Sequence, residues 1–224
     1  MLTRRGFVGR VAGSLAAVLP LDLPHRIGPR PGRVILDLGE HCGLRESLSG
    51  YTSALGCLGP PPPVRGADAR SQSRCALLIV PAAVDVPPPA VAAIVGCLRA
   101  GGTVLLESGA GFASARDYEV HRAVLRDHFG VDVGAAVALW SSPRPQGIPY
   151  VDYTWPCRAQ VRDFSRVVTL EGPGEIIARV HGLPVSLKRR SRRGTLICLG
   201  SPLGPALLAG DAEARRWLYQ VVAG

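Results

Sequence analysis

A continuously apolar segment, residues 75–81, places the strongest constraint on the fold of this chain. Its sequence, CALLIVP, shows no alternation of polar and apolar side chains. A run of this kind is typical of a strand that is buried on both faces of a parallel sheet. Three prolines at residues 87–89 then precede an apolar helix over residues 90–99, because proline is tolerated in a first helical turn. The run TVLLE at residues 103–107 predicts the next buried strand.

The same alternation of strand and helix extends through the first half of the chain. Residues 33–39 predict a strand, residues 44–55 carry apolar side chains at helical spacing, and residues 115–129 predict a helix that ends at Gly130. This order is typical of an α/β fold with a doubly wound, mostly parallel sheet.

The second half of the chain predicts an antiparallel extension of that sheet. Residues 141–162 are rich in proline and aromatic side chains, and we expect an ordered, irregular surface loop there. Turn residues separate several short apolar runs in the remainder. The expected strands are residues 131–140, 167–170, 175–180, 185–189 and 195–199, and the expected final helix is residues 204–222.

The N-terminus has the layout of a twin-arginine export signal. Arg4 and Arg5 precede a weakly apolar run, residues 11–19, that contains no acid. That run is about half the roughly 20 residues needed to cross a bilayer. We therefore predict a signal over residues 1–24, a single domain over residues 30–224, and a periplasmic or extracytoplasmic location. The alternative is a cytosolic protein with a basic N-terminus.

The composition fits a globular domain, with 47% hydrophobic residues and a net charge of +9. The densest basic run holds Lys188, Arg189, Arg190, Arg192 and Arg193. No aromatic residue that stacks on bases stands beside this run, so we do not expect nucleic-acid binding. Its positive potential instead favours peripheral contact with anionic lipid or with an acidic protein.

The six cysteines show no metal-ligand spacing, so the sequence predicts neither a metal site nor a cofactor. Cys75, Cys97 and Cys198 lie in apolar runs and are expected to pack as small core residues. If a disulfide forms, Cys42 with Cys57 is the first pair to test, since both flank one predicted helix.

Two segments resemble the class I glutamine-amidotransferase-like superfamily. They are CALLIVPAAVDVPPPAVAAIVGCLRAGGTVLLESGAGF, beginning at Cys75, and GTLICLGSPLGPALLAGDAEARRWLYQVV, beginning at Gly194. The likeness covers residues 33–222 as architecture and is greatest to non-catalytic branches: the trehalose-utilisation-type proteins and the trimerisation domain of some β-galactosidases. It implies a flavodoxin-like or amidotransferase-like sheet.

Catalytic members of that superfamily place a nucleophilic cysteine on the turn between a strand and a helix. Here that turn begins Glu107-Ser108-Gly109 and contains no cysteine. The resemblance therefore implies that glutaminase activity is absent, with Ser108 as a candidate substitute nucleophile. The run GAGFAS, residues 109–114, approaches a dinucleotide-binding fingerprint, but Ser114 stands where the third glycine belongs, and we favour a tight turn that needs small residues.

Polar residues at the carboxyl ends of the predicted strands form a candidate pocket. In open α/β sheets ligands bind at that edge, which brings Glu40, His41 and Arg45 together with Glu107 and Ser108. Glu40 and His41 supply groups for acid–base chemistry. The alternative is that they only begin the following helix. His121 and His128 are interpreted as packing or surface residues.

Aromatic residues gather at Tyr150, Tyr153 and Trp155, with Asp152 among them. Such a segment suits recognition of a sugar or a protein strand, because aromatic faces bury area at low entropy cost. The alternative is that the rings anchor the segment to its own domain.

Two functions from different classes follow. The first is an exported, non-catalytic domain that binds a protein partner or assembles into a homo-oligomer or complex. The second is a hydrolase or a sugar-processing or sugar-binding protein, with Glu40, His41 and Glu107 around the pocket.

Overall fold

The computed structural model describes residues 32–67, 75–140, 149–163 and 165–224. The predicted export signal lies outside the described residues, as do residues 141–148 of the predicted surface loop. Among the described helices, none combines the length and the apolar composition that a membrane crossing requires.

One sheet organises the described residues, and it has nine strands in the order β2-β1-β3-β4-β11-β10-β9-β6-β7. The first five strands of this order run parallel to one another. They are β2 (Val64–Gly66), β1 (Gly32–Asp37), β3 (Cys75–Ala83), β4 (Thr103–Ser108) and β11 (Gly194–Leu199). The chain is therefore an α/β protein built on a large, mostly parallel sheet.

The other four strands continue the sheet by antiparallel pairing. They are β10 (Leu183–Ser191), β9 (Glu175–Val180), β6 (Tyr150–Tyr153) and β7 (Ala159–Arg162). The remaining strands, β5 (Asp132–Ala138) and β8 (Arg166–Glu171), form a separate antiparallel pair. An antiparallel extension is confirmed, but β11, which was expected within it, belongs to the parallel part, and β5 and β8 form a second sheet.

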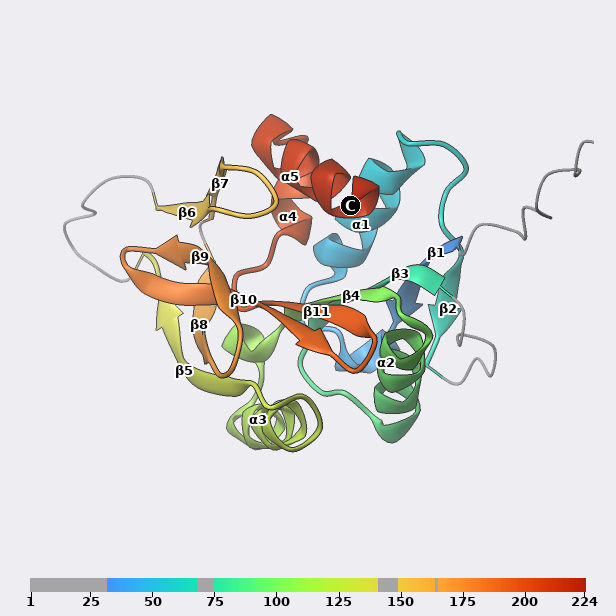
Figure 1. Cartoon of the computed structure of the whole chain (residues 1–224). Helices are drawn as coiled ribbons and strands as arrows, with labels where there is room; N and C mark the ends of the chain where they lie inside the picture. Colours follow the sequence, from blue (N-terminus) through green and yellow to red (C-terminus); the bar gives the residue numbers. More distant parts are fainter. Residues whose placement is uncertain (1–31, 68–74, 141–148, 164) are drawn as a thin grey trace, which may run out of the picture.

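Helices cover both faces of the parallel strands (Figure 1). One face carries α1 (Arg45–Gly56), α4 (Gly204–Leu208) and α5 (Ala212–Ala223), and the other carries α2 (Pro88–Ala100), with α3 (Ala115–Phe129) on the same side against β5. Two short 3-10 helices, η1 (Gly39–His41) and η2 (Ala110–Phe112), follow β1 and β4.

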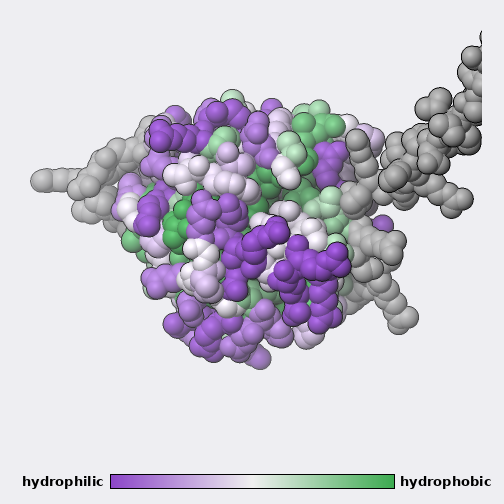
Figure 2. All heavy atoms as spheres, in the orientation of Figure 1, coloured by the Kyte–Doolittle hydropathy of each residue, from purple (hydrophilic) through white to green (hydrophobic). Residues whose placement is uncertain are grey.

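Successive strand residues face opposite sides of the sheet, and each side has its own core. On β3, Leu77 and Ile79 pack toward α1 and α5, whereas Leu78 and Val80 pack toward α2 and α3. All four side chains are buried, which explains why the apolar run showed no alternation. Hydrophilic side chains cover most of the surface seen in Figure 2, with hydrophobic ones in small areas between them.

The helix boundaries follow local signals that the sequence contains. Pro88 lies in the first turn of α2, and Gly101 ends that helix in the left-handed conformation, with a φ of 92°. The side chain of Ser114 accepts a hydrogen bond from the Asp117 N–H at the start of α3, and Gly130 ends that helix at a φ of 61°. The predicted range of α3 is confirmed residue for residue.

Two predictions about the second half of the chain are wrong. The described part of residues 141–162 is not an irregular loop, because β6 and β7 form a hairpin there. The predicted final helix is two helices, since Gly210 adopts a φ of 81° between them and the Asp211 side chain begins α5 by accepting the Ala214 N–H. Both features shape the surface at the carboxyl edge of the parallel strands.

Candidate functional site

Glu107, near the end of β4, is a buried carboxylate with four hydrogen-bond donors. It accepts hydrogen bonds from Ser47 Oγ at 2.5 Å and Tyr51 Oη at 2.7 Å, both on α1. The backbone N–H groups of Leu203 and Gly204 each donate to it at 3.1 Å. Burial raises the pKa of this carboxyl group, and the four hydrogen bonds oppose the rise. Both of its oxygens accept hydrogen bonds from the fold, so Glu107 ties β4 to α1 and α4.

Two glycines allow α1 and α4 to approach closely enough to enclose Glu107. A Cβ on Gly50 would lie 2.0 Å from the backbone oxygen of Gly204, and a Cβ on Gly204 would lie 2.2 Å from Ser47 Cα. Side chains at these positions would separate the helices. The sequence thus builds the enclosure with small residues at the crossing of the helices.

Ser108 Oγ lies 2.9 Å from His121 Nε2 of α3 and accepts the Ala110 N–H at 3.2 Å. Ser108 is 3% exposed and His121 is fully buried. Burial lowers the pKa of His121 to about 4, so the imidazole is neutral at pH 7. Within the described part of the chain, His121 Nδ1 has no hydrogen-bond partner. This pair packs α3 against the turn after β4, which agrees with the interpretation of His121 as a packing residue.

The glycine-rich turn after β4 is a place of close backbone approach. A Cβ on Gly109 would lie 2.3 Å from the Ala82 backbone oxygen, and one on Gly111 would lie 2.9 Å from the Arg166 backbone oxygen. The small residues there are accounted for by packing of the turn against β3 and β8.

Glu40, His41 and Arg45 follow β1, as predicted, but they do not join Glu107. Glu40 and Arg45 are exposed, and His41 Nδ1 lies 3.4 Å from Asp85 Oδ2. Among the described residues, none of these three side chains contributes a hydrogen bond to Glu107. The structure therefore separates the predicted polar pocket into an exposed group after β1 and an enclosed centre after β4.

An open cavity of about 930 Å³ lies beside the enclosed centre, at the carboxyl edge of the parallel strands. Its walls come from the loops after β1, β4 and β11, from the β6–β7 hairpin and from the corner between α4 and α5. The lining includes Glu46, Phe112, Tyr150, Gln160, Arg162, Asp163, Pro202, Pro205, Asp211 and Glu213.

The aromatic side chains Phe112 and Tyr150 contribute rings to the lining of this cavity. Phe112, on η2, is 38% exposed. Tyr150 Oη accepts a hydrogen bond from Arg162 Nη2 at 3.1 Å across the hairpin, and the Arg162 guanidinium lies 5.7 Å from the centre of the Tyr150 ring. The cavity therefore combines apolar faces with groups that donate and accept hydrogen bonds.

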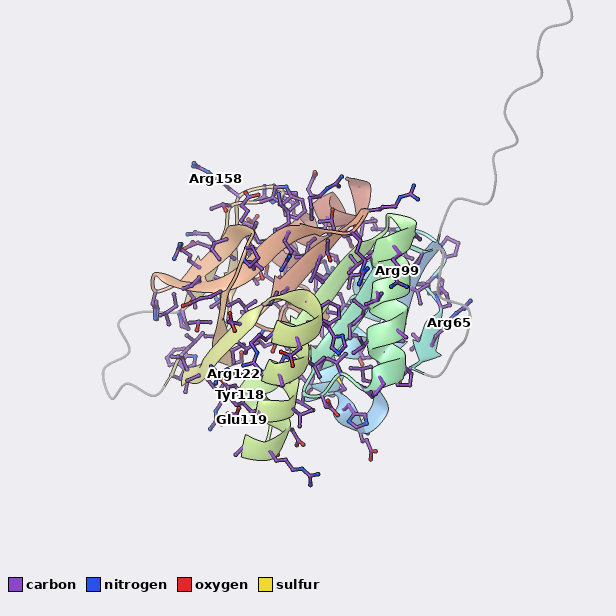
Figure 3. The ribbon with its side chains drawn as sticks, turned by 60° about the horizontal axis from the view of Figure 1, so that its bottom comes forward. Arg65, Arg99, Tyr118, Glu119, Arg122 and Arg158 are labelled. Atoms are coloured by element: carbon purple, nitrogen blue, oxygen red, sulfur yellow. The ribbon has the colours of Figure 1, made fainter. Side chains whose placement is uncertain are left out.

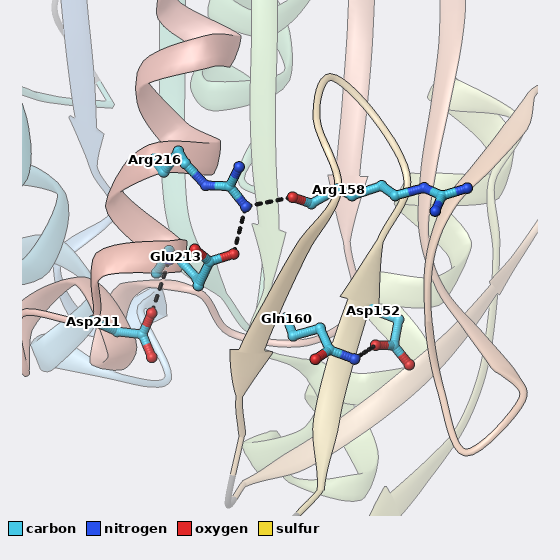
Figure 4. Close-up of polar contacts among 7 residues, drawn as sticks. Asp152, Arg158, Gln160, Asp211, Glu213 and Arg216 are labelled. Atoms are coloured by element: carbon cyan, nitrogen blue, oxygen red, sulfur yellow. Dashed lines mark hydrogen bonds and ion pairs between the residues drawn. The ribbon is translucent and has the colours of Figure 1, made fainter.

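Most polar groups of the cavity are oriented by neighbours, as Figure 4 shows for Gln160, Asp211 and Glu213. Gln160 Nε2 donates to Asp152 Oδ1 at 2.7 Å. Glu213 accepts from Arg216 Nη2 at 2.5 Å, and Arg216 also reaches the Arg158 backbone oxygen. Asp211, which also lines the cavity, caps the start of α5 by accepting a hydrogen bond from the Ala214 N–H.

Asp163, directly after β7, is the buried carboxylate of the cavity. It is 6% exposed and accepts hydrogen bonds from Ser201 Oγ and, at 2.7 Å, from the Ser165 N–H. Ser201 follows β11, so this contact joins the hairpin to the parallel part of the sheet. Asp163, Gln160, Arg162 and Glu213 were not predicted from the sequence. Ser201 and Pro202 follow β11, which was expected in the antiparallel extension but runs parallel to β4, so their place at this edge is a finding of the structure.

Three further predicted binding residues, Asp152, Tyr153 and Trp155, do not line the cavity. Tyr153 is buried, with its ring centre 4.6 Å from that of Trp217, and burial raises its pKa. The Trp155 backbone oxygen accepts from Trp217 Nε1 at 2.6 Å, and Lys188 Nζ lies 4.2 Å from the centre of the Trp155 ring. These two rings anchor the hairpin to α5 and β10, and Asp152 is exposed.

The basic run divides between internal contacts and exposed arginines. Lys188 Nζ lies 2.6 Å from Glu175 Oε2, and Arg189 Nη1 donates to the Phe129 backbone oxygen at 2.6 Å. Arg190, Arg192 and Arg193 are exposed. Arg192 lines an open groove of about 710 Å³ between α2 and α3, the two helices that lie side by side in Figure 3.

The pair Cys42 and Cys57 is not placed to form a disulfide. The twelve-residue helix α1 stands between them, and a helix of that length spans about 18 Å. A disulfide needs Cα atoms about 4.4–6.8 Å apart. All six cysteines are reduced in the structure. In the described residues, no group of three or more His, Cys, Asp and Glu side chains is positioned to hold a metal ion.

No family model and no curated protein sequence matches this chain. Solved structures do match it in fold. A β-galactosidase from Bacillus circulans sp. alkalophilus gives a TM-score of 0.58 at 16% identity, over 83% of this chain and 31% of that one. An exo-β-1,4-mannosidase from Opitutaceae bacterium strain TAV5 gives 0.59 at 14% identity, over 86% and 36%.

An α-L-fucosidase from Paenibacillus thiaminolyticus gives a TM-score of 0.56 at 13% identity, over 87% of this chain and 32% of that one. At these identities the likeness concerns the fold alone. The chain spans about a third of the length of each of these three proteins.

Proposed function

We propose that this chain is a non-catalytic carbohydrate-binding domain, and that its ligand occupies the cavity at the carboxyl edge of the parallel strands. The observation that carries the proposal is the joint placement of Phe112 and Tyr150 with Gln160, Arg162 and Asp163 around one cavity of about 930 Å³. That volume lies within the range of small-molecule sites, about 300–1,000 Å³.

Sugars require this mixture of groups. Their C–H faces pack on aromatic rings, while their hydroxyl groups need donors and acceptors held in fixed directions. Phe112 supplies an exposed ring, Gln160 an amide and Arg162 a guanidinium, and neighbouring side chains hold the latter two in place. Such preorganised groups bind a polar ligand at a lower entropic cost.

The fold matches support the choice of ligand class by analogy. The three matched proteins are named as a β-galactosidase, a mannosidase and a fucosidase, all of which act on glycosides. A shared fold alone does not establish a shared function, so the sugar class rests on the composition of the cavity together with this analogy.

Binding is favoured over hydrolysis because glycoside hydrolysis generally needs two suitably placed carboxyl groups, one acting as acid and the other as nucleophile or base. Asp163 is engaged by Ser201 and Ser165, Glu213 by Arg216, and Asp211 by the start of α5. Glu107 is enclosed by its four donors. These carboxylates serve the fold and orient the cavity, which leaves Glu46 as the one lining carboxylate among the described residues without such a role, whereas hydrolysis needs a pair.

We further propose a doubly wound, flavodoxin-like arrangement within the class I glutamine-amidotransferase-like superfamily. The strand order β2-β1-β3-β4-β11 supports it, since consecutive parallel strands numbered along the chain then follow the order 2-1-3-4-5. Ser108 occupies the turn where catalytic members carry cysteine, and its 3% exposure argues against a nucleophilic role. The twin-arginine pattern of residues 1–24 supports export of the folded domain.

Assembly with a protein partner or with further copies of the chain is the second candidate function. The fold matches favour it, because the matched region is about a third of a larger chain in each case. The exposed basic residues Arg190, Arg192 and Arg193 suit an acidic partner or an anionic membrane surface. A single particle mass at the monomer value in light scattering, over a wide range of concentrations, would argue against self-assembly.

The test of the sugar proposal is calorimetric titration with galactose, mannose and fucose and with disaccharides of each. We expect binding of at least one of these sugars without release of a monosaccharide. Gln160→Ala should weaken binding about tenfold, the equivalent of about 1.4 kcal/mol. The matched control is Gln220→Ala, since Gln220 is also exposed but lies outside the cavity lining. Equal losses in the two variants would contradict the proposed site.

A further inference from the structure

Two buried thiols far from the cavity lie closer together than non-bonded atoms normally pack. Cys75 Sγ and Cys97 Sγ are 2.8 Å apart. Carbon atoms pack at about 3.5–4.0 Å, and sulfur is larger than carbon. A disulfide bond measures about 2.05 Å, so the two sulfurs are less than about 1 Å from bonding distance.

The two cysteines meet at the amino edge of the parallel strands, opposite the cavity. Cys75 is the first residue of β3, and Cys97 lies in the last turns of α2. Gly102 permits the approach, because a Cβ there would lie 2.4 Å from the Cys75 backbone oxygen and 2.6 Å from Cys97 Sγ. The end of the helix is therefore held directly against the start of the strand.

We propose that Cys75 and Cys97 form a disulfide when the protein meets a disulfide oxidant, such as a thiol–disulfide oxidoreductase or oxidised glutathione. The Cys75 thiolate attacks one sulfur of the oxidant, which breaks the oxidant's S–S bond, forms a mixed disulfide and releases one thiolate. The Cys97 thiolate then attacks the Cys75 sulfur and releases the second thiolate. In total, two electrons and two protons pass from the two thiols to the oxidant, which becomes two thiols.

The environment of the pair assigns the order of attack. The contact between the two sulfurs lowers the pKa of the Cys75 thiol, whereas the same contact and burial raise the pKa of Cys97. Cys75 is also the more exposed of the two, at 4% against 0%. The thiolate is the reactive form in exchange, so Cys75 is the sulfur that begins the reaction.

The other cysteines lack such a partner in the structure. Cys42 donates to the Leu44 backbone oxygen, Cys57 donates to the Ser53 backbone oxygen, and Cys198 is buried with a pKa that burial raises to about 12. All six cysteines lie in the described part of the chain, where Cys75 and Cys97 are the two whose sulfurs are in contact. The modification is thus specific to one pair.

The disulfide would close a loop between residues that are 22 positions apart. A cross-link over a loop of this size restricts the unfolded chain and raises the melting temperature by about 6–12 °C for a domain of this length. Oxidising compartments preserve such bonds, whereas cytosolic reductants remove them. The test below uses purified protein, so its result is independent of the proposed export and of the proposed sugar ligand.

The sequence offers a direct readout, because trypsin cleaves after Arg74 and Arg99 and leaves both cysteines in one peptide without another cysteine. The full chain is incubated folded with oxidised glutathione. A second sample is refolded from denaturant in a glutathione redox buffer, where burial does not limit access. Both are then alkylated, digested and weighed by mass spectrometry. We expect the peptide 75–99 without alkyl groups and lighter by two hydrogen atoms than the dithiol.

Melting temperatures of oxidised and reduced samples complete the test. The rise on oxidation should disappear in Cys97→Ala and persist in Cys198→Ala, which removes another buried thiol. Recovery of peptide 75–99 with two alkyl groups in both samples would overturn the proposal. So would a cross-link that joins either cysteine to Cys42, Cys57 or Cys157. The mass readout on the natural chain decides the matter even if Cys97→Ala does not fold.

Discussion

The enclosed centre around Glu107 and the open cavity beside it share two segments of the chain but differ in access to solvent. At the start of α1, Ser47 donates to Glu107 whereas Glu46 lines the cavity. In the loop after β11, the N–H groups of Leu203 and Gly204 donate to Glu107, whereas Pro202 and Pro205 line the cavity. The strand-end acid therefore holds the wall of the cavity in place, and the groups available to a ligand come from the surrounding loops and the hairpin.

The largest expected effect is on the enclosed centre. Glu107→Ala leaves two hydroxyl groups and two backbone N–H groups without their acceptor, and it should lower the free energy of unfolding by about 3–5 kcal/mol. Urea denaturation measures this loss. Glu119→Ala, at an exposed position on α3, should change stability by less than about 0.5 kcal/mol. Equal stability of the two variants would show that Glu107 is not a structural anchor.

The next effect concerns pH and the buried His121. Its pKa of about 4 in the folded state lies below the ordinary value of 6.5, so the unfolded chain binds a proton in this range and the folded chain does not. The stability that the folded chain gains from a neutral His121 is fully present above pH 6.5. It is lost as the pH falls toward 4, which lowers the free energy of unfolding by about 3 kcal/mol.

Denaturation of the natural chain and of His121→Gln at pH 7 and pH 4 isolates this contribution. The difference in stability between the two proteins should shrink or reverse at pH 4. His128→Gln, at an exposed position of the same helix, should follow the natural chain. A pH dependence that is unchanged in His121→Gln would contradict a buried, neutral imidazole.

A smaller effect is expected where α1 crosses α4. The added methyl group of Gly50→Ala would lie 2.0 Å from a backbone oxygen, and it should cost about 1–3 kcal/mol by forcing the helices apart. Gly56→Ala, at the end of the same helix, meets nothing within 4 Å and should be neutral or slightly stabilising. Urea denaturation compares the two variants. Equal stability would mean that the close approach of these helices is not required.

The parallel part of the fold was predictable because its strands and helices carry their own local signals. The apolar runs of β3 and β4, the prolines before α2 and the glycines after α2 and α3 each determine a boundary within a few residues. The hairpin β6–β7 was missed, because Tyr153 is held by contact with the distant Trp217 and Asp163 by the distant Ser201. Long-range contacts of this kind leave no periodic pattern in the sequence.

The candidate site was predictable in place but not in composition. The sequence predicts a pocket at the carboxyl edge of the strands, and Tyr150, which it assigns to a separate aromatic segment, lines the cavity found there. The chemistry of Glu40, His41 and Glu107 suggested one pocket, yet the depth of Glu107 depends on how closely Gly50 and Gly204 pack. Spacing along the chain does not indicate that depth.

The most direct test of the account is the affinity of Phe112→Ala for whichever of galactose, mannose, fucose or their disaccharides the natural chain binds. Phe112 and Leu58 have nearly equal exposure, 38% and 39%, and only Phe112 lines the cavity, so Leu58→Ala is the matched control. Removing the ring should weaken binding about tenfold or more, which is about 1.4 kcal/mol, while Leu58→Ala leaves the affinity unchanged and both variants remain folded. Unchanged affinity in Phe112→Ala, or no binding of any of these sugars by the natural chain, would contradict the assignment of the cavity as a carbohydrate site.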